Sequence, residues 1–308
     1  LTNVKAQLSS EQLSNWPHFE RTLRRDKSLP KGELMGESID LFLVSRNLRM
    51  PYEVQESLDP IMMEYEVSLD LSLDARDTRI DSLQDQIKDA MASMDFELGL
   101  SAMDQIMSAR VRVREVQDEY LLRITELLPA EWSETFEETA MKKAYPKVYR
   151  PTPIEQLLKT VRSIPTLTSE QRMQLDAIEA DFDLQRGALE MRLLHAYRQH
   201  EPGEPRRRVQ AMLDRREGNA RQSRSATPMD TIAAERNDLV AETRRRILAV
   251  LNPEQIGDMP SSGQAKKNGL RPRNPNAAVP AGSIATPSGR HRTSPKFGDS
   301  ATGGADKR

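Results

Sequence analysis

The stretch Leu167-Thr-Ser-Glu-Gln171 decides the fold of this chain, because it recurs as Leu251-Asn-Pro-Glu-Gln255 and as Leu8-Ser-Ser-Glu-Gln12. In each copy a leucine precedes a residue whose side chain can cap a helix, and a glutamine follows at the third helical position. Such a glutamine reaches back to the backbone of the cap, so each copy predicts the start of a helix. The residues that define the motif are Leu8, Ser9, Glu11, Gln12, Leu167, Thr168, Glu170, Gln171, Leu251, Asn252, Glu254 and Gln255.

Two degenerate copies extend the repeat. Met50-Pro-Tyr-Glu-Val54 and Leu128-Pro-Ala-Glu-Trp132 keep the apolar first position and the glutamate. The residues that flank the copies also correspond: Leu58, Ile61 and Tyr65 follow Met50 as Leu175, Ile178 and Phe182 follow Leu167, and Ile124 precedes Leu128 as Ile247 precedes Leu251. This correspondence predicts an internal duplication, with Met50 and Leu167 opening two modules and Leu128 and Leu251 closing them.

The chain resembles the Spy/CpxP-like LTxxQ family of periplasmic proteins over residues 8–259. In that family two LTxxQ motifs bracket a bent helical unit. The resemblance implies an all-α fold of tandem helical-hairpin modules of the Spy/CpxP type with a disordered C-terminal tail. The expected domains are the closing part of a preceding module (1–49), a degenerate module (50–140), a Pro-containing connection (141–166), a second module (167–259) and a disordered basic tail (260–308).

Helical periodicity supports this organisation independently. Between Ile61 and Leu128 there is no proline and a single glycine, Gly99, as expected of long helices. Apolar residues recur at steps of three, four and seven on both sides of Gly99, which predicts a helical hairpin whose turn lies near residue 100. One short helix is expected around residues 154–161, and the second module is expected to break at 201–205 and 218–228.

Composition limits the classes of function. The chain has no cysteine, which excludes disulfides, thiolate catalysis and cysteine-ligated metals. Residues 50–140 hold 22 acidic against 7 basic side chains, whereas residues 260–308 hold 9 basic against 2 acidic ones. No apolar run is long enough to span a membrane. Catalytic and nucleotide-binding motifs are absent, so we expect a protein that is not an enzyme and binds neither cofactors nor nucleic acid.

The resemblance further implies an envelope or periplasmic protein that binds other proteins, either unfolded clients or an envelope sensor, and that can self-associate. Two alternatives stay open: a structural or scaffolding helical protein without clients, and a metal-responsive protein that binds zinc or copper. Because the first residue is Leu1 and no signal peptide is recognisable, we expect the chain to begin inside a larger protein.

Four clusters of side chains are candidates for binding a partner or a metal ion. Partner binding is suggested by the methionine pair Met62 and Met63, and by a basic elbow formed by Arg206, Arg207, Arg208, Arg215 and Arg216. The elbow could meet acidic clients, anionic lipid or the acidic first module, or be a solvated bend. His195 and His200 could bind metal, but we interpret them as exposed residues near a turn. Asp70, Asp74, Asp77, Asp81, Asp85 and Asp89 form an acidic stripe, interpreted as a solvated helix face rather than a cation- or client-binding one.

Overall fold

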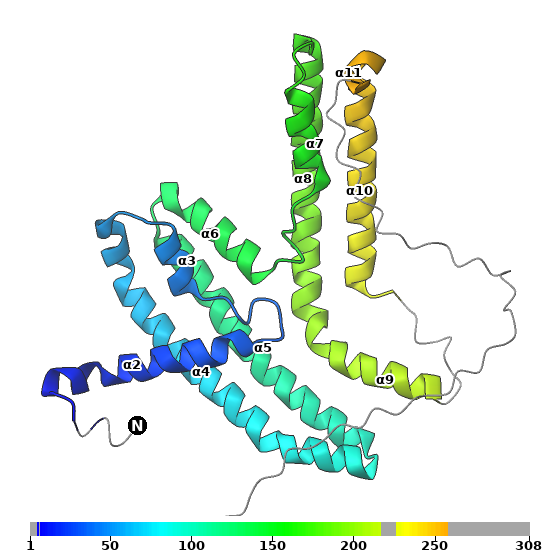
Figure 1. Ribbon diagram of the computed structural model, residues 1–308. Coiled ribbons are helices and arrows are strands. Elements are labelled where there is room, and N and C mark those ends of the chain that lie inside the picture. Colours follow the sequence, from blue (N-terminus) through cyan, green and yellow to red (C-terminus); the bar gives the residue numbers. More distant parts are fainter. Residues whose placement is uncertain (1–4, 6, 217–225, 258–308) are drawn as a thin grey trace, which may run out of the picture. The chain divides into compact units, whose positions relative to one another are not determined.

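The computed structural model describes residues 5, 7–216 and 226–257, and every regular element in this part of the chain is helical. The expected all-α fold built of helical hairpins is therefore confirmed for these residues (Figure 1). The expected basic tail at 260–308 and most of the expected break at 218–228 lie outside the described residues.

The longest hairpin joins α4 (Tyr52–Ser93) to α5 (Phe96–Leu127). Its turn is not near residue 100, as the glycine suggested, but at Met94 and Asp95. Met94 adopts the left-handed conformation with a φ of 55° and ends α4. Asp95 then caps α5 by accepting a hydrogen bond from the Leu98 N–H at 3.1 Å. This local capping outweighs the preference of Gly99 for a turn, and Gly99 lies in the first helical turn of α5, facing Ala90.

Shorter elements cover this hairpin. α2 (Ser10–Ser28) packs on α4 and continues into the 3-10 helix η1 (Leu29–Lys31), while α3 (Leu41–Asn47) packs on α6 (Ala130–Ala144). The apolar side chains of η1, α3 and α6 form one core with α4 and α5, which includes Leu58, Tyr65, Leu73, Ile124 and Phe136. The burial of this core stabilises the hairpin far more than helix propensity alone would.

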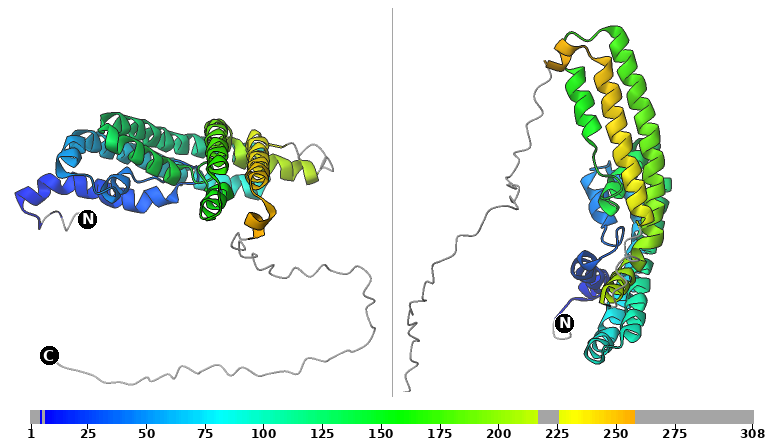
Figure 2. Two further views of the ribbon diagram at one scale, coloured as in Figure 1. Left: turned by 90° about the horizontal axis from the view of Figure 1, so that it is seen from above. Right: turned by 90° about the vertical axis from the view of Figure 1, so that its right-hand side faces the viewer.

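A second hairpin pairs α8 (Ser169–His200) with α10 (Pro228–Val250), which lie side by side in both views of Figure 2. The short helix expected within the Pro-containing connection is present as α7 (Pro153–Arg162), and it packs on both helices of the hairpin. After α8 the chain turns through η2 (Glu201–Gly203) into α9 (Glu204–Arg216). The break expected at 201–205 is thus a change of helix direction. A final turn, α11 (Pro253–Gly257), follows α10.

The duplicated positions have the same burial in both hairpins. Each pair of equivalent residues is buried in a core: Met50 and Leu167, Leu58 and Leu175, Ile61 and Ile178, Tyr65 and Phe182, Ile124 and Ile247, and Leu128 and Leu251. The two cores are separate clusters, but the end of α8 belongs to the first one through Leu193 and Leu194. α8 therefore connects the two hairpins through packed side chains as well as through the chain.

Candidate functional site

The capping motifs occupy the helix starts that the sequence predicts. Ser9 begins α2 and Thr168 begins α8, each in a complete capping box with the following glutamine. Asn252 begins α11 in the same way, because its Oδ1 accepts the Gln255 N–H at 2.8 Å and its own N–H donates to Gln255 Oε1 at 3.0 Å. The glutamates Glu11, Glu170 and Glu254 lie exposed in the first helical turns, where negative charge is favourable.

Two of these motifs also bind each other. Gln171 Nε2 donates to the Val250 carbonyl at 2.8 Å and to Gln255 Oε1 at 2.9 Å. Gln255 Nε2 donates to the Thr166 carbonyl at 3.0 Å and to Gln171 Oε1 at 3.1 Å. In each side-chain amide, Nε2 thus donates two hydrogen bonds and Oε1 accepts two. The contacts of Gln171 and those of Gln255 are equivalent. We call this reciprocal pair the glutamine latch.

The remaining motif copies lack this contact. Gln12 lies exposed, and within the described residues its side chain bonds only to Ser9. In the first hairpin Val54 and Trp132 stand at the glutamine positions, and both pack against the apolar core instead. The full latch is therefore particular to the 167–171 and 251–255 copies. The assignment of Leu8 to a preceding module stays a prediction.

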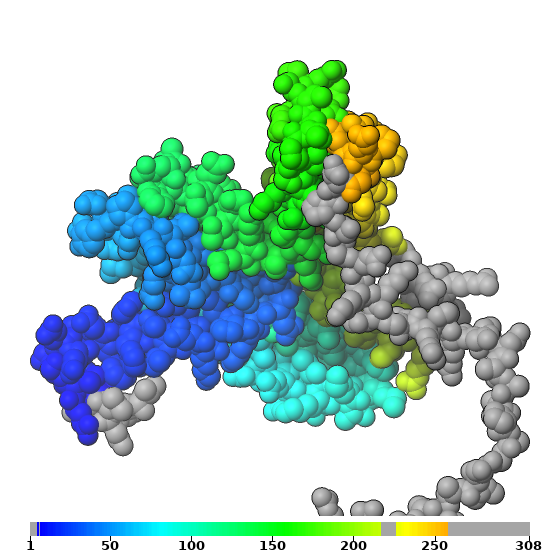
Figure 3. All heavy atoms as spheres, turned by 45° about the horizontal axis from the view of Figure 1, so that its top comes forward, coloured from blue at the N-terminus to red at the C-terminus, as the bar shows by residue number. Residues whose placement is uncertain are grey.

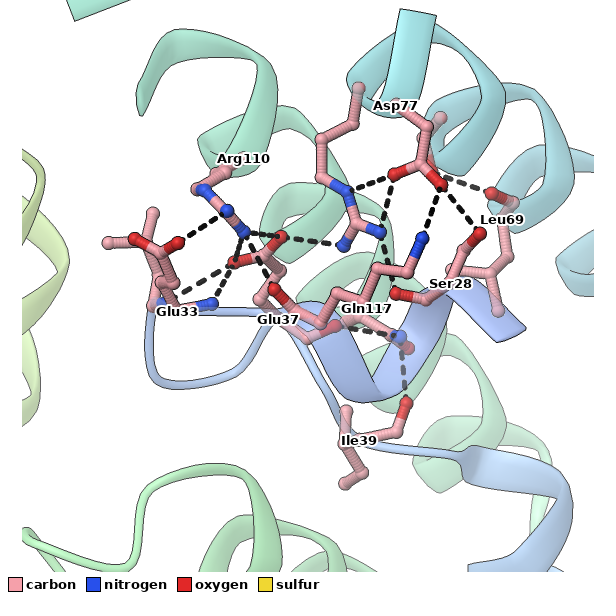
Figure 4. Close-up of polar contacts among 12 residues, drawn as sticks. Ser28, Glu33, Glu37, Ile39, Leu69, Asp77, Arg110 and Gln117 are labelled. Atoms are coloured by element: carbon pink, nitrogen blue, oxygen red, sulfur yellow. Dashed lines mark hydrogen bonds and ion pairs between the residues drawn. The ribbon is translucent and has the colours of Figure 1, made fainter. Parts of the chain in front are cut away.

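A buried charge network lies beneath the loop between η1 and α3 (Figure 4). The Glu37 carboxylate is 0% exposed and accepts hydrogen bonds from Arg76 Nη1 at 2.8 Å and from Arg110 Nη1 at 3.1 Å. It also accepts the backbone N–H groups of Glu33 and Leu34 at 2.8 and 3.1 Å. Two cations and two amides thus compensate its charge where no solvent reaches it, and the loop is fixed to α4 and α5.

Arg76 extends the network to α2. Its Nη2 donates to the Ser28 carbonyl at 2.6 Å and to Asp77 Oδ1 at 2.7 Å, while the Ser28 hydroxyl donates to Asp77 Oδ2 at 2.6 Å. Burial favours the neutral form of Asp77, but the hydrogen bonds from Ser28 and Arg76 outweigh it and hold the pKa of this carboxyl below its usual value.

The same loop contacts the second hairpin. The Met35 N–H donates to Glu201 Oε2 at 3.1 Å, and Arg114 Nη2 donates to the Arg198 carbonyl at 2.7 Å. Gly36 sits between them with a φ of +84° and donates its N–H to the Ala144 carbonyl at 2.8 Å. Burial raises the pKa of Glu201, which lies at the junction of α8 and η2. The loop thus joins both hairpins through backbone and side-chain contacts.

Sequence patterns missed this network, although they contained a signal for it. Arg76 falls on the apolar stripe of α4 between Leu73 and Leu83, and Arg110 and Arg114 fall on the buried stripe of α5. An arginine at a core position of a helix needs a buried acceptor. The acceptor could not be identified from sequence, because Glu37 lies in an irregular loop distant along the chain.

The acidic stripe is only partly the solvated face that was expected. Asp70 and Asp74 pair with Arg24 of α2, and Asp77 belongs to the buried charge network. Asp81, Asp85 and Asp89 are exposed. The interpretation as a solvated face is wrong for Asp70 and Asp77, because α2 packs against this part of α4, whereas Asp74 stays exposed although it pairs with Arg24.

The predicted partner-binding residues separate into different environments. Met62 is 8% exposed and lies in the core, whereas its neighbour Met63 is 70% exposed, so the two do not form one surface. Arg206 pairs with Asp104 at 2.6 Å, which is the contact with the acidic first module considered above. Arg207 pairs with Glu204 of its own helix. Arg208, Arg215 and Arg216 are exposed on α9.

His195 and His200, the candidate metal ligands, line one shallow groove with Met191 and Ile232. Within the described part of the chain, no three or more His, Asp or Glu side chains gather where they could hold a metal ion. Along residues 5, 7–216 and 226–257, no helix combines the length and apolar character needed to cross a membrane.

An apolar groove lies where α9 meets the tip of the α4–α5 hairpin, and its walls are rich in methionine. We call it the methionine groove; its lining includes Ile87, Met91, Phe96, Leu100, Met103 and Met212. Its volume is about 120 Å³, and Met91 and Met212 are 75% and 55% exposed. Figure 3 shows this end of the hairpin (cyan) at the surface on the face drawn. Met91 and Met103 lie on the apolar stripes on either side of Gly99, which predict helix cores, but Met91 is exposed.

Comparison with known proteins identifies no relative: no protein-family model, no curated protein and no solved structure matches this chain. The resemblance to the LTxxQ family therefore rests on the motifs alone.

Proposed function

We propose that this chain is a cofactor-independent, chaperone-like helical protein that binds apolar side chains of partly unfolded proteins in the methionine groove. The observation that carries the proposal is the exposure of two methionines, Met91 and Met212, around one apolar groove. Exposed apolar surface costs solvation free energy, and where it clusters it is typical of sites that bind other proteins. Methionine is unbranched and polarizable, so one such surface can accommodate side chains of different shapes.

The size of the groove favours side chains over small molecules. Small-molecule sites usually occupy about 300–1,000 Å³, whereas the methionine groove offers about 120 Å³. Its walls come from α4, α5 and α9, and the last of these is held near α5 by the Arg206–Asp104 ion pair. Flexible methionines on a rigid helical frame combine adaptable contacts with a fixed position for the bound segment.

The motif resemblance extends this proposal to location and partners. An LTxxQ-type protein would act in the cell envelope or periplasm, would bind unfolded clients or an envelope sensor, and could self-associate. A spacer function is the second candidate, and it is favoured by the glutamine latch and the buried charge network, which stiffen both hairpins without forming a binding surface.

Suppression of aggregation distinguishes these functions. Because the chain has no cysteine, dithiothreitol can be used to reduce insulin and start its aggregation without altering the chain itself. We expect the full chain to slow light scattering at stoichiometric concentration. The double variant Met91→Glu/Met212→Glu should lose most of this activity, because an apolar side chain that enters the groove would have to displace water from the introduced carboxylates.

Met173→Glu is the matched control, since Met173 is equally exposed on α8 and lies outside the groove. It should protect insulin as the unaltered chain does. A full chain that leaves aggregation unchanged would favour the spacer function, and equal losses in Met173→Glu and the groove variant would show that the groove is not the site.

A further inference from the structure

A second surface, distinct from the methionine groove, lies along the seam between α4 and α5. We call it the seam groove. It has a volume of about 540 Å³, and all of its lining residues come from these two helices. Small side chains form much of it, namely Ser72, Ala75, Ser108 and Ala109. From Gln105 to Glu119 the groove follows α5 for about 21 Å, at a helical rise of about 1.5 Å per residue.

A neighbouring groove of about 570 Å³ runs along the other side of α5, between α5 and the residues Pro202 and Gly203 of η2. The two grooves share Ser108, Arg112 and Glu115. This part of α5 is therefore a ridge with a depression on each side. Helices pack when the ridges of one enter the grooves of the other, so the surface has the form that a further helix would fit.

Charge is ordered along the seam groove. Arg112 lines the middle of the groove, Arg79 of α4 lines it on the side of Arg112 nearer the hairpin tip, and Glu115 and Glu119 line it on the side away from the tip. Among the described residues, Arg79, Arg112 and Glu115 form no ion pair, and Glu119 has only the exposed Arg123 at 3.6 Å. The groove thus offers a positive half and a negative half that its own side chains leave largely uncompensated.

We infer that the seam groove binds an amphipathic α-helix of a partner protein, with the N-terminus of that helix beside Glu115 and Glu119 and its C-terminus beside Arg79 and Arg112. A helix carries partial positive charge at its N-terminus and partial negative charge at its C-terminus, which matches this order. The small residues along the seam allow large apolar side chains of the partner to approach closely.

The inference rests on the proposed function only in that the partner is a protein, and it adds the form and direction of the bound segment.

The probe is a dye-labelled peptide of about 18 residues, about five helical turns, made of Leu, Ala, Lys and Glu with one leucine stripe and no net charge. Fluorescence anisotropy should show that the full chain binds this peptide, and that a proline at its centre weakens binding about tenfold or more.

Ser108→Trp fills the groove at an exposed position and should weaken peptide binding about tenfold. Ala92→Trp is the matched control, because Ala92 is exposed on α4 outside the groove and should leave binding unchanged. Equal binding of the proline peptide, or binding that Ser108→Trp does not change, overturns the inference. So does a dimer of the chain that Ser108→Trp dissociates, since a second copy would then fill the groove.

Direction is tested with a photo-crosslinking group at the peptide N-terminus. It should label residues near 115–119 in the unaltered chain. In the variant Arg79→Glu/Arg112→Glu/Glu115→Arg/Glu119→Arg, the crosslinking group should instead label the end of the groove near positions 79 and 105. Unchanged labelling in this variant contradicts the assigned direction. Insulin protection is measured separately, so a chain that protects insulin but does not bind the helix in the seam groove retains the proposed function and loses this inference.

Discussion

The side-chain amides of Gln171 and Gln255 form a reciprocal hydrogen-bonded pair, at 2.9 and 3.1 Å, between two copies of the same capping motif. Each glutamine also closes the capping box of its own helix and donates to the carbonyl that precedes the other motif. The motif thus has two tasks here: it starts a helix, and it joins the start of α8 to the end of α10.

Comparing Gln255→Ala with Gln12→Ala should separate the stability that comes from helix capping from the stability that comes from the reciprocal contact. The Gln255→Ala change removes the partner that the buried Gln255 supplies to the Thr166 carbonyl, the Asn252 N–H and the Gln171 amide, and should lower the free energy of unfolding by about 2 kcal/mol. Gln12→Ala removes the same capping interaction where no second motif is contacted, and should cost less than about 1 kcal/mol. Urea denaturation measures both, and equal costs would mean that the reciprocal contact adds no stability.

The buried charge network predicts a large effect of a nearly isosteric change. Glu37→Gln removes the fully buried carboxylate that Arg76 and Arg110 share and leaves these buried cations with the more exposed Asp77 and Glu33 alone, so it should cost about 3–5 kcal/mol. Glu33→Gln is the control, because Glu33 also pairs with Arg110 but is mostly exposed, and exposed pairs contribute about 1 kcal/mol or less. Thermal unfolding followed by circular dichroism should rank them in this order, and the reverse order would refute the role of Glu37.

Gly36 should not tolerate a side chain. Its φ of +84° disfavours other residues, and an added Cβ would lie 2.6 Å from the Tyr145 hydroxyl oxygen. Gly36→Ala should therefore destabilise the chain by about 2 kcal/mol or more. Gly187→Ala, inside α8 with open space around it, should instead stabilise the chain by about 0.5–1 kcal/mol. Opposite signs in the two melting-temperature shifts are the expected result.

Asp77 should contribute stability that depends on pH. Its pKa is lower in the folded chain than the ordinary value of 3.8. The ionised carboxylate therefore stabilises the fold above pH 3.8, and this contribution is lost as the pH falls through the folded-state pKa. Asp77→Asn should be less stable than the unaltered chain at pH 7, and the difference should shrink in acid. A difference that stays constant between pH 7 and pH 3 would contradict this.

Local chemistry explains which parts of the structure the sequence predicts. Capping motifs and apolar periodicity depend on residues within one or two helical turns, so the starts of α2, α8 and α11 and the buried faces of α4 and α5 could be predicted. The hairpin turn was misplaced because the left-handed residue that ends α4 is Met94, which carries no turn signal, whereas Gly99 does.

Contacts between distant segments could not be predicted in the same way. Arg76, Arg110 and Arg236 interrupt apolar stripes, which indicates buried acceptors but does not identify them. The acceptors are Glu37 for the first two and backbone carbonyls near Val148 for the third. The methionine groove was hidden for a related reason: its walls come from three helices, and periodicity treats each helix alone.

The most direct test of the central claim uses the methionines themselves. Methyl resonances of the full chain labelled with carbon-13 at methionine can be followed while an unfolded client is added. The account predicts that Met91, Met103 and Met212 shift together, whereas Met173 and Met191, which are also exposed but lie on α8 away from the groove, stay unchanged. Equal shifts in all exposed methionines, or none in the methionine groove, would contradict it.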